Sequence, residues 1–260
     1  MYFNNIEKKV ISVYEANGFL ISNIREKNLF KKISNKILFH CSNILKKKLS
    51  YNFFDYAHNY INIKDLNEIR LLIIKEINKD LEIKKIFFSI FREFLYSIAG
   101  NELVMQKNIN LSIQMPLDDS SLLDIHSDTW AGDSPYEVVG WLPLVNCYKT
   151  KSMFILNNTN SVKYSREIFN KKSINFSFKK IKKKVNWLKI NKGQLLIFNQ
   201  NLIHGNQVNM EKTTRWSLNC RFKSIFTPYS EKKLGDFFEP VTLRPASSQG
   251  MKYVYPIIKR

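Results

Sequence analysis

In the stretch Thr214-Arg215-Trp216-Ser217-Leu218-Asn219-Cys220-Arg221-Phe222, polar and apolar side chains alternate strictly from Arg215 onward. Successive side chains of a β-strand point to opposite faces, so this pattern predicts a strand with one polar and one apolar face. Arg215 and Arg221 share the polar face, where burial inside a barrel would leave both charges unpaired unless an anion binds there. Ser217 lies two residues after Arg215, and a guanidinium beside a hydroxyl suits a bidentate carboxylate.

Shorter runs of the same kind come before this stretch, with turn residues between them. Leu111, Ile113 and their polar neighbours alternate until Pro116 ends the run. Short strands at regular intervals are typical of an antiparallel sandwich or barrel. We therefore predict one jelly-roll-like β domain over residues 101–225. Its further strands are expected at Glu137–Leu144, Met153–Leu156, Gln194–Phe198 and Leu202–His204.

The first hundred residues contain few residues that break helices. All seven prolines lie at Pro116 or later, and only Gly18 and Gly100 precede residue 101. Apolar residues recur there at helical spacing. We predict an α+β protein in which helices of residues 1–100 pack against the β domain, residues 226–260 form a C-terminal extension, and 1–260 fold as one unit. The helical stripes begin at Ile6, Phe30, Leu66 and Ile83.

The composition indicates a globular protein of the cytoplasm. Hydrophobic residues make up 44% of the 260 residues and aromatic residues 13%, which excludes a disordered chain. Apolar runs such as Leu71–Ile74 are too short to cross a bilayer, and Met1–Val10 lacks the apolar segment of a secretory signal. Three cysteines at unrelated spacings fit a reducing compartment. The pattern indicates no membrane partner and does not indicate an oligomeric state.

The chain is strongly basic, with 41 Lys and Arg against 22 Asp and Glu, a formal net charge of +19. Such a balance suggests nucleic-acid binding, but heavy use of Lys, Asn and Ile is also typical of coding bias in an AT-rich genome. Between Glu167 and Glu211 there is no acidic residue, while nine lysines fall within residues 171–192. This block is either a solvated loop or a surface that attracts an anion such as phosphate.

A histidine and an aspartate two residues apart form the strongest candidate for a reactive site. In Asp124-Ile125-His126-Ser127-Asp128, both His126 and Asp128 can face one point at a strand end. His204 is the one histidine in the later predicted strands. Two histidines and one carboxylate leave three metal positions open, as in non-haem Fe(II) oxygenases, while zinc with the same ligands is an alternative. A His-x-Asp pair alone is common by chance, and Arg215 eleven residues after His204 strengthens the interpretation.

Together, His126-x-Asp128, the distal His204 and Arg215-x-Ser217 resemble the Fe(II)/2-oxoglutarate-dependent dioxygenase superfamily. The helical first hundred residues and the chain length resemble its phytanoyl-CoA dioxygenase-like branch. The sequences of residues 126–135, 140–145, 226–229 and 236–240 are similar to those of bacterial oxygenases found sporadically in carbohydrate-biosynthesis gene clusters.

This resemblance implies a double-stranded β-helix (jelly-roll, cupin-like) that uses Fe(II), 2-oxoglutarate and O2. It implies that Arg215, assisted by Ser217, binds the distal carboxylate of 2-oxoglutarate, and that Gln114 contributes a further co-substrate contact. Trp130, Asn219 and Arg221 are candidates for substrate contacts. For Trp130 the alternative is a structural role in the core. Arg221 is the alternative anchor of the co-substrate if Arg215 does not bind it. The implied metal ligands are His126, Asp128 and His204.

The implied activity is hydroxylation of a carbohydrate or sugar-derived small molecule in surface-polysaccharide or sugar biosynthesis. The presence of Asp128 argues against halogenation, because a small residue there would open a halide position. Sugars under construction are often carried as phosphate or nucleotide esters, so we expect an anionic sugar derivative, with residues 171–192 bordering the pocket mouth. Two alternatives remain: a basic nucleic-acid-binding protein without catalysis, and a nucleic-acid or protein demethylase with the same iron site.

Overall fold

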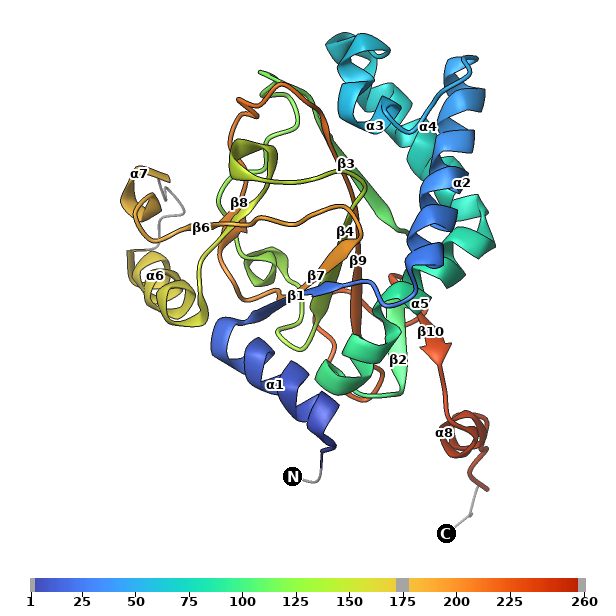
Figure 1. Cartoon of the computed structure of the whole chain (residues 1–260). Helices are drawn as coiled ribbons and strands as arrows, with labels where there is room; N and C mark the ends of the chain where they lie inside the picture. Colours follow the sequence, from blue (N-terminus) through green and yellow to red (C-terminus); the bar gives the residue numbers. More distant parts are fainter. Residues whose placement is uncertain (1–2, 172–177, 257–260) are drawn as a thin grey trace.

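Two antiparallel sheets form the centre of the computed structural model, which describes residues 3–171 and 178–256 (Figure 1). The larger sheet has the strand order β1-β7-β4-β9-β2-β10, with β3 also paired to β9, and the smaller sheet has the order β6-β5-β8. This arrangement confirms the predicted α+β, jelly-roll-like class. The larger sheet contains β1 (Phe19–Asn23), β2 (Leu103–Gln106), β3 (Asn110–Gln114), β4 (Val138–Pro143), β7 (Gln194–Asn199), β9 (Arg215–Ser224) and β10 (Phe238–Thr242), and the smaller sheet contains β5 (Phe154–Ile155), β6 (Asn186–Trp187) and β8 (His204–Gly205).

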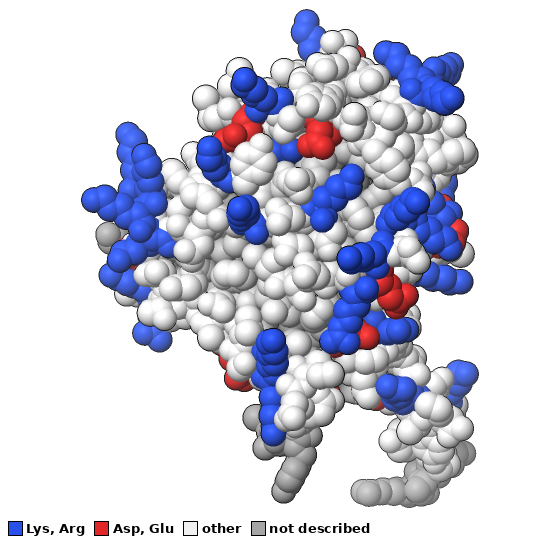
Figure 2. All heavy atoms as spheres, viewed as in Figure 1, with Lys and Arg blue, Asp and Glu red and all other residues white. Residues whose placement is uncertain are grey.

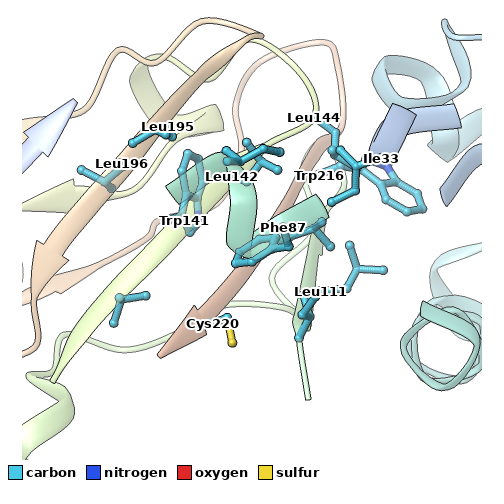
Figure 3. Close-up of a cluster of buried hydrophobic side chains, with 14 of the residues drawn as sticks. Ile33, Phe87, Leu111, Trp141, Leu142, Leu144, Leu195, Leu196, Trp216 and Cys220 are labelled. Atoms are coloured by element: carbon cyan, nitrogen blue, oxygen red, sulfur yellow. The ribbon is translucent and has the colours of Figure 1, made fainter. Parts of the chain in front are cut away.

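Strand β9 contains the alternating residues 215–222, and it organises the larger sheet. It pairs with β4 over six residues and with β3 over five, so its two faces are fixed by neighbours on both sides. The apolar face is buried, with Trp216 and Phe222 fully inaccessible to solvent. Figure 3 shows Trp216, Leu142 and Phe87 in this core. The opposite face carries Arg215, Asn219 and Arg221, which line a cavity.

Four helices confirm the apolar stripes of the N-terminal region, namely α1 (Asn5–Asn17), α2 (Lys27–Leu45), α4 (Leu66–Lys79) and α5 (Leu81–Ile98). Helix α5 packs directly on the larger sheet, because the rings of Phe87 and Phe91 lie 6.3 and 6.1 Å from the ring of Phe222. The approach is close at Gly140 of β4, where an added Cβ would lie 3.0 Å from Phe222 and 3.1 Å from Phe91. Short helical turns, α3 (Phe53–Tyr56), η1 (Ala57–Asn59) and η2 (Ile63–Asp65), join α2 to α4.

Strands at both ends of the chain join the larger sheet, which the sequence pattern did not predict. Strand β1 follows directly after Gly18, whose φ of +78° ends α1, and pairs along β7. Strand β10 lies in the C-terminal extension and pairs with β2. The larger sheet therefore contains strands from all three predicted segments. Further helices are α6 (Asn158–Lys171), α7 (Phe178–Ile181) and α8 (Pro245–Gly250), and the 3-10 turns η3 (Asp128–Ala131) and η4 (Lys149–Lys151) lie in the β domain.

Within the described ranges, no helix combines the length and the apolar character needed to cross a membrane. The three cysteines are buried and unpaired by disulfides.

Candidate metal centre and co-substrate cavity

The two predicted histidine ligands are brought together by backbone pairing. The amide of His126 donates to the carbonyl of His204 over 3.0 Å, and the amide of His204 donates back over 2.8 Å. This isolated antiparallel bridge connects the loop before η3 to strand β8 of the smaller sheet. The two rings consequently lie with their centroids 4.4 Å apart.

Asp128 completes the cluster from the first residue of η3. Its Oδ1 is 3.7 Å from Nε2 of His126, and its Oδ2 is 4.0 Å from Nε2 of His204. One ligand atom from each residue lies within 4.8 Å of the other two. Because metal–ligand distances are about 2 Å, one ion placed among these atoms could contact all three. No other such group of His, Cys, Asp and Glu occurs among the residues that the structure describes.

Hydrogen bonds orient both imidazoles toward the centre of the cluster. Nδ1 of His126 lies 2.6 Å from the carbonyl oxygen of Asp124, and Nδ1 of His204 lies 2.8 Å from that of Leu202. A carbonyl only accepts, so each Nδ1 carries the proton and each Nε2 presents its lone pair. Burial lowers the pKa of His204 to about 4, because desolvation disfavours the charged ring. His204 is therefore neutral at ordinary pH, which is the form that binds metals.

The cluster opens into a cavity of about 710 Å³ between the two sheets. Its inner wall includes the three predicted ligands together with Arg215, Asn219 and Arg221 of β9. One side of its mouth is formed by η2 and the start of α4, and the other side by the loop before His126. Several lining residues are exposed there. The exposed or half-exposed residues of this mouth include Ile63, Lys64, Asn67, Arg70, Ser120, Ser121 and Leu123.

Arg215 is a buried cation without a carboxylate partner. Its exposed fraction is 4%, its Nη2 donates to Ser112 Oγ over 3.0 Å, and its Nε has no hydrogen-bond partner. None of the Asp and Glu side chains in residues 3–171 and 178–256 forms an ion pair with it. Burial lowers the pKa of this guanidinium, because desolvation disfavours its charge. A buried charge of this kind is costly unless an anion joins it, and the cavity leaves room for one.

Ser217 and Gln114, the predicted co-substrate residues beside Arg215, lie behind the cavity wall. Ser217 pairs with Ser112 across β9 and β3, and its fully buried Oγ has no hydrogen-bond partner. Gln114 pairs with Arg215 in the same ladder. Its Nε2 donates to the carbonyl oxygen of Gln207 over 2.6 Å, whereas its Oε1 has no partner.

Of the three predicted substrate residues, Asn219 and Arg221 line the cavity and Trp130 does not. Asn219 lines the cavity and accepts a hydrogen bond of 3.3 Å from Asn110 Nδ2. Arg221 also lines it, but its Nη2 lies 3.2 Å from Asp128 Oδ1 and 3.1 Å from Asp133 Oδ2. Trp130 is absent from the lining formed by described residues. It packs instead against the small apolar cluster that contains Phe154, Leu156, Ile181 and Ile203.

For its described residues, the lysine-rich block does not border the cavity mouth, so the prediction was wrong there. Within the described part of the block, residues 178–192, no residue lines the cavity. The ring of Phe178 lies 5.1 Å from that of Phe154, which places α7 against the smaller sheet. In Figure 2, lysine and arginine side chains project at the left edge, where Figure 1 places α6 and α7. Lys172 lies outside the described residues. Among the described residues, the cations at the mouth are Lys64 and Arg70, which the sequence pattern did not single out.

No protein-family model matches the chain, and no curated protein matches it. The structure is similar to solved non-heme enzymes. A nickel complex of the non-heme monooxygenase ThoJ is 11% identical, with 92% of this chain and 85% of that chain covered and a TM-score of 0.57. HygX from Streptomyces hygroscopicus with nickel and 2-oxoglutarate bound is 10% identical, with 91% and 92% covered and a TM-score of 0.54.

A third similar structure is the non-heme alpha-ketoglutarate-dependent epimerase SnoN from nogalamycin biosynthesis. It is 10% identical, with 86% of this chain and 85% of that chain covered and a TM-score of 0.51. The chain shares the fold of these three proteins. The similarity extends over the helical region as well as the β domain, because at least 86% of the chain is covered in each comparison.

Proposed function

We propose that this protein is an Fe(II)- and 2-oxoglutarate-dependent oxygenase. One observation carries the proposal: a single cavity contains both an oriented two-histidine, one-carboxylate cluster and the buried, unpaired guanidinium of Arg215. The cluster fits a metal with three open positions, and the guanidinium fits the free carboxylate of a dicarboxylic co-substrate. A nucleic-acid-binding protein without catalysis would leave both features without a role.

The residues divide the work in a way that follows from their positions. His126, Asp128 and His204 would hold Fe(II), and Arg215 would bind the distal carboxylate of 2-oxoglutarate with help from Ser112. When bound, iron and 2-oxoglutarate supply an oxidation in which O2 is consumed, succinate and CO2 are released, and one oxygen atom enters a substrate C–H bond. Ser217 and Gln114 would support the Arg215 side of the site from behind the wall. The cavity would position the substrate and limit access of water.

The proposed outcome is hydroxylation. The similar structures include an enzyme described as a monooxygenase and one described as an epimerase, so both outcomes occur on this fold. A zinc ion would fit the same three ligands, but it would give no role to a co-substrate carboxylate at Arg215.

We infer that the substrate is a small, hydroxyl-rich molecule with an anionic group, consistent with a sugar derivative. The cavity volume of about 710 Å³ lies within the usual range for small-molecule sites. Asn67, Asn110 and Asn219 give its wall amide groups that suit hydroxyls. Lys64 and Arg70 provide positive charge at the mouth. Arg70 donates to Asn67 Oδ1 over 2.7 Å and to the carbonyl of Leu111 over 3.4 Å, and neither cation forms an ion pair with a described acid.

Anaerobic titration with Fe(II) and 2-oxoglutarate tests the proposed activity. We expect the visible absorption band of an iron-bound keto acid in the wild-type protein and its loss in His204→Ala. Succinate release in air should then require both iron and 2-oxoglutarate. Absence of the band from a folded wild-type protein, or binding of zinc without any response to 2-oxoglutarate, would contradict the proposal.

A further inference from the structure

Arg221 connects the candidate metal ligand to a second, deeply buried carboxylate. Its Nη2 bridges Asp128 Oδ1 at 3.2 Å and Asp133 Oδ2 at 3.1 Å. Asp133 is 3% exposed, and its Oδ1 forms an ion pair with Nζ of Lys232. Four charges of alternating sign therefore run from the metal centre toward the surface, in the order Asp128, Arg221, Asp133 and Lys232.

The C-terminal extension supplies the outer end of this charge chain. Lys232 and Phe237 both belong to it, and the Phe237 ring lies 4.8 Å from Nζ of Lys232 and 6.0 Å from the guanidinium carbon of Arg221. The aromatic ring thus contacts both cations, which is favourable for charges placed near a ring face. Asp133 is a buried charge whose desolvation is offset by these two cations, so loss of either cation would be costly.

This arrangement fixes the orientation of the Asp128 carboxylate between the two histidines. Arg221 contacts Oδ1, which also lies 3.7 Å from Nε2 of His126, while Oδ2 lies 4.0 Å from Nε2 of His204. With one oxygen hydrogen-bonded to Arg221, the carboxylate would be held in one orientation toward a metal bound by the two imidazoles.

We propose that Arg221 is a positioning residue for Asp128 and that Asp133 and Lys232 hold Arg221 in place. The segment after β9 thereby completes the metal centre. This inference rests on the metal site of the proposed function, but it concerns residues for which that proposal has no need. It also reassigns Arg221 from a substrate contact or co-substrate anchor to a support of the metal ligand.

Electrostatics alone gives the opposite expectation, which makes the proposal testable. A cation beside a metal ligand repels the metal, so removal of its charge should tighten metal binding. If Arg221 acts by positioning, its removal should instead weaken metal binding by about 10–100-fold, as is typical when a ligand loses its supporting hydrogen bond. The two accounts differ in the sign of the effect.

The experiment measures Co(II) affinity by isothermal titration calorimetry on the full chain. We expect Arg221→Gln to weaken Co(II) binding by about 10–100-fold and Arg221→Lys to recover part of the loss. Circular dichroism and the thermal midpoint of each metal-free variant separate a local effect from loss of the fold. A wild-type protein that binds no Co(II) would overturn the proposed function, whereas equal or tighter binding by Arg221→Gln would overturn the positioning role.

A matched pair of surface variants serves if Arg221→Gln fails to fold. Lys232→Gln and Lys233→Gln remove the same charge from adjacent positions, but Lys233 is exposed and lies outside the charge chain. We expect Lys232→Gln to weaken Co(II) binding several-fold relative to Lys233→Gln, because Asp133 would lose one of its two anchors. Equal affinities in the two variants would overturn the inference.

Discussion

His126 and His204 exchange both of their backbone hydrogen bonds, at 3.0 and 2.8 Å, although 77 intervening residues separate them in the chain. The main chain therefore sets the separation of the two rings, and the side chains contribute little to it. A metal site built in this manner exists before the metal arrives. We therefore expect the fold to survive replacement of the ligand side chains.

The first prediction concerns the ligands. Substitution of His126, Asp128 or His204 by Ala should reduce iron-dependent succinate release to background, because each variant keeps only two of the three metal ligands. The far-UV circular dichroism should stay that of the wild type, since the backbone bridge between β8 and the loop remains. Retention of iron binding by any of the three variants would count against the shared site.

The second prediction concerns Arg215. Arg215→Lys should weaken 2-oxoglutarate binding by about 10-fold or more, since a point charge cannot reproduce a bidentate fork. Iron affinity should be unchanged, because Arg215 does not contact the ligands. The measurement is the anaerobic titration of the iron–2-oxoglutarate band, with the exposed Arg166→Lys as the control. Equal affinities in wild type and Arg215→Lys would show that the anion is bound elsewhere.

The third prediction is a pH dependence of the metal-free protein. The pKa of His204 is about 4 in the folded state and about 6.5 in an unfolded chain, so the unfolded state binds more protons between these values. Stability should therefore rise with pH over this window. Urea unfolding measures the free energy of unfolding at pH 5 and at pH 7. The increase between these two pH values should be about 2 kcal/mol larger in wild type than in His204→Gln. Equal differences would mean that His204 is not buried as a neutral ring.

The fourth prediction concerns the anionic group of the substrate. Arg70→Gln should lower the turnover of a phosphorylated or nucleotide-linked sugar, and high salt should have a similar effect on the wild type. The matched control is the triple variant Lys182→Gln, Lys183→Gln and Lys184→Gln, which should be as active as wild type. If the triple variant loses turnover and Arg70→Gln does not, the lysine block is the anion site.

The fifth prediction concerns the contact between helix and sheet. Gly140→Ala should destabilise the protein by about 1–3 kcal/mol, since the new methyl group would press on Phe222 and Phe91 at 3.0 and 3.1 Å. Gly250→Ala is the control, because no atom lies within 4 Å of its added Cβ. Thermal or urea unfolding measures both. A Gly140→Ala protein as stable as the control would mean that the two rings move aside without cost.

Local patterns in the sequence predicted much of the fold, and they singled out the three candidate ligands that the fold brings together. The alternation of residues 215–222 predicts β9 because a strand has a period of two, and the stripe from Ile83 predicts α5 because a helix has a period of 3.6. The spacing of His126 and Asp128 likewise depends only on neighbours in the chain. Strand β1 escaped prediction because five residues between a helix and a turn carry too little pattern to separate a strand from a loop.

The tertiary structure decided which charges meet. Arg215 and Arg221 share one strand face and look equivalent in the sequence, yet one is left without a carboxylate while the other bridges Asp128 and Asp133. The sequence pattern also favoured the lysine block as the cavity mouth, whereas the fold places Lys64 and Arg70 there. Periodicity fixes the direction of a side chain relative to its own strand or helix. The partners it meets depend on how segments distant in the chain pack together, and that packing is absent from any local pattern.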